Sequence, residues 1–205
     1  MKLCSETWQS SVKDDRLGFR ERTGQAGRIL RPTSFFITTQ ASMVELISMA
    51  SKILVIYDSR SGMTEKIARV VAEGARRIPG TTVQLKRAET LNPREAATAD
   101  AYAFGSPSHF GIMSGKILTA LTDLHSVRLK MAGKPMAVFT TGTGGQVTAL
   151  ENIERIIGIF NPNFVKPGVA VETVPGRANP WMVDKAQAAD LGRRLAKAAA
   201  KRTKP

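Results

Sequence analysis

The sequence has a single cysteine, Cys4, so it can form neither an intramolecular disulfide nor a cluster of cysteine metal ligands. It also lacks any apolar run near the roughly 20 residues that a helix needs to cross a bilayer, and we expect no membrane span. Internal repeats are absent. The apolar content of 42% is ordinary for a globular chain with a real core. One cysteine is compatible with a reducing compartment, and we expect a cytoplasmic location.

Acidic residues are few. The sequence has 17 Asp and Glu and 30 Lys and Arg, which gives a formal net charge of +13. Such a balance can indicate nucleic acid, acidic lipid or an acidic protein partner. The basic residues are dispersed, however, often as pairs such as Arg76-Arg77 and Arg193-Arg194. They are not interleaved with aromatic residues, and no nucleic-acid motif is visible. We therefore expect a solvated basic surface and no specific nucleic-acid binding.

Residues 1–50 lack the sustained periodicity of a helix or strand, and their polar residues are mixed with glycine and proline. An organelle-targeting segment is disfavoured by the acidic residues Glu6, Asp14, Asp15 and Glu21. The segment also lacks the apolar core of a secretory signal. Two interpretations remain open: a disordered extension, or upstream sequence read from too early a start codon. The folded domain is expected over residues 51–205.

Strands and helices alternate from residue 51 onward. Short apolar or alternating runs predict five strands, at 53–57, 81–86, 101–104, 136–140 and 168–174. Amphipathic stretches between them predict helices. This alternation predicts an α/β fold with a doubly wound, five-stranded parallel sheet covered on both faces. Gly74 falls on the apolar face of the first helix, where close packing on the sheet would explain a mid-helix glycine.

The first strand runs directly into a loop of small and hydroxyl residues, and a helix opens at about Thr64. The loop reads Ser59-Arg60-Ser61-Gly62-Met63-Thr64. Free N–H groups at a helix N-terminus, with hydroxyl donors and a glycine that allows close approach, are what a phosphate site needs. The alternative is a connection whose Ser and Thr residues only cap the helix.

Two more loops rich in small residues follow the third and fourth predicted strands. The second loop spans 105–113 and contains Pro107-Ser108-His109-Phe110-Gly111, and the third spans 140–146 with three glycines and three threonines. In doubly wound sheets, ligands bind outside the carboxyl ends of the strands. Three such loops at one end of the sheet predict a site where backbone closely approaches a planar ligand.

The segments YDSRSGMT, FGSPSHFGIM and FTTGTGGQ, in this order and spacing, resemble the flavodoxin-like family, and most closely its WrbA-type NAD(P)H:quinone oxidoreductases. The resemblance runs from about residue 52 to the C-terminus. It implies strand order 2-1-3-4-5 and bound FMN. The phosphate would be surrounded by Ser59, Arg60, Ser61, Gly62, Met63 and Thr64. The ring would be bordered on one side by Pro107, Ser108, His109, Phe110 and Gly111, and on the other by Thr141, Gly142, Thr143, Gly144 and Gly145.

The resemblance also implies NAD(P)H as a reductant and reduction of a quinone or similar small-molecule acceptor. The alternatives are an electron carrier between redox protein partners and an FMN-binding domain with a regulatory role. No metal is expected. His109 either relays a proton or packs beside the ring, and it is the only candidate catalytic residue.

Three departures separate the chain from the WrbA pattern. The third loop has one glycine fewer, no histidine precedes the fifth strand, where Ile156, Ile157 and Gly158 stand, and the segment after that strand is short. Because of these departures, the resemblance does not decide whether the chain has a nicotinamide site or assembles into a homo-oligomer. The third loop also lacks the ring-stacking tyrosine common in carrier flavodoxins, and the basic charge is opposite to theirs.

Overall fold

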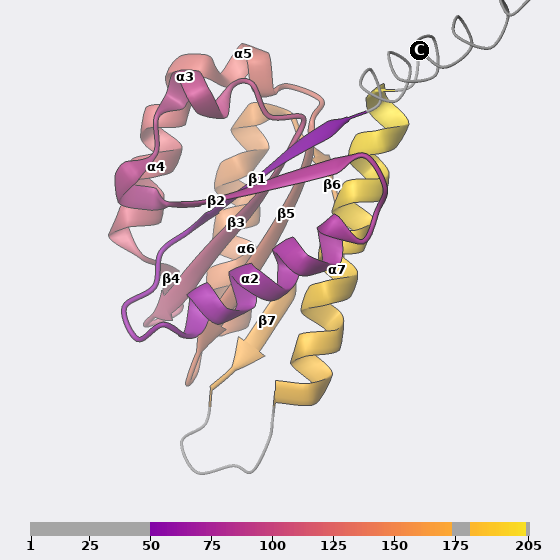
Figure 1. Cartoon of the computed structure of the whole chain (residues 1–205). Helices are drawn as coiled ribbons and strands as arrows, with labels where there is room; N and C mark the ends of the chain where they lie inside the picture. Colours follow the sequence, from indigo (N-terminus) through magenta and orange to yellow (C-terminus); the bar gives the residue numbers. More distant parts are fainter. Residues whose placement is uncertain (1–49, 174–180, 204–205) are drawn as a thin grey trace, which may run out of the picture.

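The computed structural model describes residues 50–173 and 181–203. The expectation for the N-terminal extension therefore concerns residues outside the described part of the chain. The described part is built on a sheet whose main strands are parallel and run in the order β2-β1-β3-β5 (Figure 1). Their bounds are β1 Ser51–Tyr57, β2 Thr81–Arg87, β3 Ala101–His109 and β5 Pro135–Gly142.

The last position of the sheet is filled by two short strands, of which only the second falls within the predicted range 168–174. The short strand β6, Asn163–Phe164, pairs with the start of β5, and β7, Val169–Glu172, pairs with its end. Pro167 lies between these two strands, and a proline has no N–H group to donate to a neighbouring strand. The predicted doubly wound parallel sheet and its strand order are confirmed.

Helices cover both faces of the sheet. One face carries α2, Met63–Arg76, and α7, Trp181–Thr203. The other carries α4, Gly115–Leu124, and α6, Gln146–Ile157, with the short helices α3 Pro93–Ala96, α5 Arg128–Met131, η1 Ala88–Thr90, η2 His125–Val127 and η3 Gly158–Phe160. Alternate residues of the strands point to opposite faces, so two apolar cores form. Ile53 and Val55 face α2 and α7, and Leu54 and Ile56 face the other layer.

The helices α2 and α7 approach each other unusually closely at two glycines. A Cβ atom on Gly74 would fall on the backbone of Ala189, and one on Gly192 would fall on the backbone of Val71. The prediction that Gly74 packs closely is right, but its predicted partner is wrong, because the glycine faces α7 rather than the sheet. Sequence periodicity marks a buried helix face without indicating which element covers it.

Among the described residues, no helix is both long and apolar enough to cross a bilayer.

Candidate cofactor-binding site

The first loop leaves the carboxyl end of β1 and leads into α2. The N–H group of Asp58 donates to the carbonyl oxygen of Gly105 on β3, 3.0 Å away, which ties the start of the loop to the sheet. Gly62 stands at the N-cap of α2 with φ +83°, a left-handed conformation that glycine adopts without steric cost. No side chain caps this helix. The N–H groups of its first turn and the positive end of its dipole are therefore available to an anion.

The hydroxyl groups of this loop have different environments. The Oγ of Ser59 is buried and has no hydrogen-bond partner among the described residues, although burial without a partner is costly. The hydroxyl of Thr64 is also buried, but it is paired with the hydroxyl of Thr141 on β5 at 2.8 Å. Ser61 and Arg60 are exposed. The loop thus offers one buried, unused donor beside an uncapped helix N-terminus.

The second loop is a β-hairpin rather than an irregular loop. The strand β4, Ile112–Met113, pairs antiparallel with the end of β3, with His109 opposite Ile112. The two residues of the turn, Phe110 and Gly111, have φ values of +55° and +79°. Two left-handed residues are typical of the tightest hairpin connection. Phe110 is fully exposed in this conformation, so its side chain contributes nothing to the core.

The third loop follows β5 and leads into α6. Gly145, at the N-cap of α6, has φ +68°, and a Cβ atom there would lie 2.8 Å from the Cα of Gly111. The hydroxyl of Ser108 donates to the carbonyl oxygen of Gly144 at 3.1 Å. The second and third loops therefore touch through their backbones. Together they form the floor of an open hollow of about 580 Å³, lined by Ser108, His109, Phe110, Gly111, Thr143, Gly144, Gly145 and Thr148.

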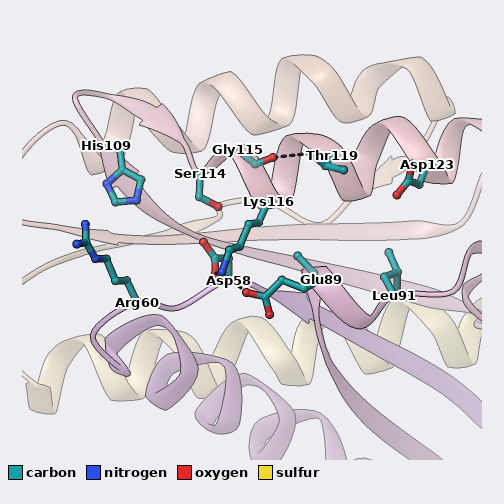
Figure 2. A pocket seen from close by; sticks show the side chains of 11 residues that line it. Asp58, Arg60, Glu89, Leu91, His109, Ser114, Gly115, Lys116, Thr119 and Asp123 are labelled. Atoms are coloured by element: carbon teal, nitrogen blue, oxygen red, sulfur yellow. Dashed lines mark hydrogen bonds and ion pairs between the residues drawn. The ribbon is translucent and has the colours of Figure 1, made fainter.

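A second cavity of about 700 Å³ adjoins this hollow (Figure 2). Lys116 of α4 points across it, forming an ion pair with Glu89 and lying 3.9 Å from the buried carboxylate of Asp58. The hydrogen bond between Lys116 and Glu89 raises the pKa of the lysine and lowers the pKa of the glutamate. These three residues come from separate segments of the chain, so no local sequence pattern indicates this cavity.

His109 lines both the hollow and the cavity, and Arg60 lines the cavity on the same side (Figure 2). The histidine is exposed, at the end of β3. No group of three His, Cys, Asp or Glu residues positioned to hold a metal ion occurs within residues 50–173 and 181–203.

Comparison with known proteins relates the chain to flavodoxins. No family model matches it. A flavodoxin of Aquifex aeolicus is 39% identical over 94 residues, which are 45% of this chain. The match spans about half of that relative, 51% of its length. A solved flavodoxin from the domain Archaea superposes with a TM-score of 0.63 at 21% identity, covering 72% of this chain and 98% of the other.

The chain has a flavodoxin-like fold. A WrbA-like flavodoxin of Agrobacterium tumefaciens also superposes, with a TM-score of 0.62 at 22% identity over 76% of this chain and 100% of the other. The flavodoxin-like resemblance read from the three loops is confirmed. At these identities, the solved structures establish the fold alone.

In this flavodoxin-like fold, the three predicted loops lie together at the carboxyl end of the parallel strands. Their residues are not equally accessible. Met63, Pro107 and Ser108 are half-buried, whereas Thr143 and Gly144 are exposed. Thr141 is buried beneath the loops and is already paired with Thr64. It therefore connects the first and third loops rather than lining the hollow.

Proposed function

We propose that this flavodoxin-like chain binds FMN, with the phosphate at the N-terminus of α2. The observation that carries the proposal is the buried, unpartnered hydroxyl of Ser59 beside an uncapped helix start at Gly62. A phosphate would accept hydrogen bonds from this hydroxyl and from the first-turn N–H groups. The Thr64 hydroxyl is engaged elsewhere, so the contribution of Thr64 to the phosphate would come from its N–H group.

The isoalloxazine ring would lie against the second and third loops, where they form the floor of the shared hollow. The backbones of Gly111 and Gly145 already meet there, so no Cβ atom stands between a flat ligand and the peptide groups. Bordering contacts would come from Pro107, Ser108, His109 and Phe110 on one side, and from Gly142, Thr143 and Gly144 on the other. Oriented N–H groups in these loops would favour a ring that gains negative charge.

We infer that the reaction is NAD(P)H-dependent reduction of a quinone or a similar small acceptor. Bound FMN would supply the electron chemistry, and the protein would supply binding and orientation. The hollow is open, and His109 stands between it and the adjoining cavity, where a small molecule has room to approach. His109 stands at the edge of the hollow, where its imidazole ring would pass a proton to or from a bound acceptor.

The second candidate function is an electron carrier between protein partners. It is supported by the match to the Aquifex flavodoxin, which includes 94 residues of this chain. Anaerobic mixing of the FMN-loaded protein with NADPH or NADH separates the two functions. Rapid loss of the flavin absorbance, and its return on adding benzoquinone, is expected for the reductase. An absorbance that neither nucleotide changes, although a reduced redox protein bleaches it, would establish the carrier instead.

The phosphate site is tested with Ser59→Ala. Removal of an orphaned buried hydroxyl should leave the stability of the FMN-free protein unchanged or raise it. The same change should weaken FMN binding by roughly 10- to 100-fold, since a hydrogen bond to a charged group contributes about 1.5–3 kcal/mol. Titration of FMN fluorescence measures the Kd, and urea unfolding measures the stability.

Thr81→Val is the matched control, because the hydroxyl of Thr81 is likewise buried without a partner among the described residues but lies at the start of β2, away from the loops. This variant should bind FMN as the unchanged protein does. Equal FMN affinity for Ser59→Ala and Thr81→Val would exclude the proposed phosphate site.

A further inference from the structure

Basic side chains collect at the end of the molecule opposite the candidate site. One groove of about 570 Å³ is lined by Gly133, Asn163, Arg194, Lys197, Ala198, Lys201 and Arg202. A second hollow of about 430 Å³ is lined by Arg94, Ser126, Val127, Arg128, Leu129 and Lys130. No acidic residue lines either one. We call the surface formed by these two sets of residues the basic pole.

The two parts of the basic pole belong to one end of the fold. The last turns of α7 and the helix α5 both lie toward the amino ends of the strands, away from the end of β7 (Figure 1). Gly133 follows α5 closely and lines the α7 groove, and its N–H group donates to the carbonyl oxygen of Asn161 at 2.8 Å. That hydrogen bond joins the segment after α5 to the segment after η3, so the two hollows lie next to each other.

Several cations of the basic pole have no hydrogen-bond or ion-pair partner among the described residues. Lys197, Lys201 and Arg202 make no hydrogen bond or ion pair with the residues that the structure describes, and Lys197 and Lys201 stand one helical turn apart, where like charges repel. Arg194 differs, because it pairs with Asp190 and donates to the carbonyl oxygens of Lys166 and Pro167. The free cations are therefore available to an external anionic surface.

The cavity at the candidate site has the opposite balance. It is lined by three acidic residues, Asp58, Glu89 and Asp123, and by the two cations Arg60 and Lys116. The two hollows of the basic pole therefore differ from the candidate site in the sign of the charges that line them. A charge asymmetry of this kind orients a protein as it approaches a charged surface.

Exposed aliphatic side chains accompany these cations. Leu129 is 81% exposed and stands between Arg128 and Lys130, and Ile159 of η3 is 55% exposed. The segments that carry them are in contact, since α5 packs against η3. Large apolar side chains that project from a basic surface are typical of proteins that bind the membrane interface, where the apolar groups enter the headgroup region and the cations meet anionic lipid.

We propose that the basic pole binds the surface of a bilayer that contains anionic phospholipids. The exposed aliphatic residues favour this partner over nucleic acid, whose single strands are bound by stacking on aromatic rings. Among the described residues, the one large aromatic side chain that is strongly exposed is Phe110, at the other end of the molecule. A chain bound in this way would present its candidate cofactor site to the aqueous phase, open to soluble partners.

The test is sedimentation of the purified full chain with vesicles. Vesicles of phosphatidylcholine containing phosphatidylserine should bind the protein, and vesicles of phosphatidylcholine alone should not. Each basic residue near an anionic surface contributes roughly fivefold to the partition coefficient, so Lys197→Gln with Lys201→Gln should reduce it by about 25-fold. Leu129→Gln should also reduce it, because the apolar contact with the lipid is lost.

The controls keep net charge and polarity matched. Lys66→Gln with Lys185→Gln removes an equal number of positive charges near the N-termini of α2 and α7, and Leu118→Gln changes an exposed leucine of α4. Both controls should bind vesicles as the unchanged protein does. The proposal is overturned by equal binding to the two kinds of vesicle or by no binding. It is also overturned if each control variant loses as much vesicle binding as the test variant that it matches. Binding to duplex DNA that Leu129→Gln leaves unchanged, together with no binding to vesicles, would overturn it as well.

Discussion

The hydroxyl of Thr64, in the first turn of α2, lies 2.8 Å from the hydroxyl of Thr141 near the end of β5, and both side chains are buried. The pair connects the first and third loops beneath the candidate site, across 77 positions of sequence. It also spans β3, which lies between β1 and β5 in the sheet. The two loops that would hold different parts of the proposed FMN are thereby fixed relative to each other.

Thr64→Val should remove this connection while keeping nearly the same side-chain volume. The Thr141 hydroxyl would then be buried without a partner, which costs about 1–3 kcal/mol. We expect the free energy of unfolding to fall by that amount in urea titrations. Thr122→Val is the control, because its exposed hydroxyl donates only to a carbonyl of its own helix. A loss of the same size in both variants would contradict a special role for the Thr64–Thr141 pair.

Phe110 occupies a backbone conformation that suits glycine or asparagine, with φ +55° and a fully exposed side chain. The left-handed conformation costs an ordinary residue about 1–2 kcal/mol. Phe110→Asn should therefore raise the unfolding free energy by about 1 kcal/mol, because asparagine is favoured in this turn. The same variant should bind FMN more weakly, since the proposed contact with the ring is lost.

Urea unfolding and FMN titration of the same preparation separate these two effects. Gly111→Ala, at φ +79° in the same turn, should have the reverse effect on stability, because it places a Cβ atom in the left-handed conformation. An unchanged FMN affinity in Phe110→Asn would show that the exposed ring of Phe110 does not contact the cofactor.

Gly192→Ala should destabilise the packing of α7 on α2. The added Cβ would meet the carbonyl oxygen of Val71, a backbone atom that can move only with its helix. Overpacking of this kind costs about 1–3 kcal/mol, which outweighs the gain of about 1 kcal/mol from replacing a helical glycine. Thermal unfolding should show a lower Tm. Gly158→Ala, where nothing lies within 4 Å of the new Cβ, should show no such decrease.

Lys134 links the start of β5 to the end of α3. Its ammonium group donates to the carbonyl oxygens of Ala97, at 3.0 Å, and Ala99. Lys134→Met would leave both carbonyls without this donor, and we expect the unfolding free energy to fall by about 1–3 kcal/mol at neutral pH. Chemical unfolding of the two proteins measures the difference.

The pH dependence of the Lys134 contribution follows from its burial, which lowers the pKa of Lys134 below its ordinary value of 10.5. Between the folded and the unfolded pKa, the unfolded chain binds more protons than the folded one. The unfolding free energy should therefore rise with pH in that alkaline window. The rise should be absent in Lys134→Met, and an identical pH profile for both proteins would contradict this assignment.

The parallel strands and the position of the three loops could be predicted because each follows from local pattern, whereas the strand order was implied by the resemblance to the flavodoxin-like family. Apolar runs marked the strands, and loops at the carboxyl ends of parallel strands must lie together. Ser59 was identified from its residue type alone, and the structure adds that its hydroxyl is buried without a described partner.

The remaining features depend on contacts between distant segments. The hairpin at Phe110 escaped prediction because β4 has only two residues, too few to show an alternating pattern. The pairing of Thr64 with Thr141, the approach of Gly74 to α7 and the Lys116–Glu89 pair each need the tertiary arrangement. Charge counts showed a basic protein, but only the fold places Lys197 and Lys201 far from the candidate site.

The close contact of α7 with α2 has a consequence for synthesis. During translation, β1 and α2 leave the ribosome long before α7, which supplies Leu191 and Leu195 to their shared core. Until then, the part of α2 and of the sheet face that α7 covers stays exposed to solvent. Such an intermediate is a natural client for chaperones, and the speed at which a cell completes this polypeptide should influence how much of it escapes aggregation.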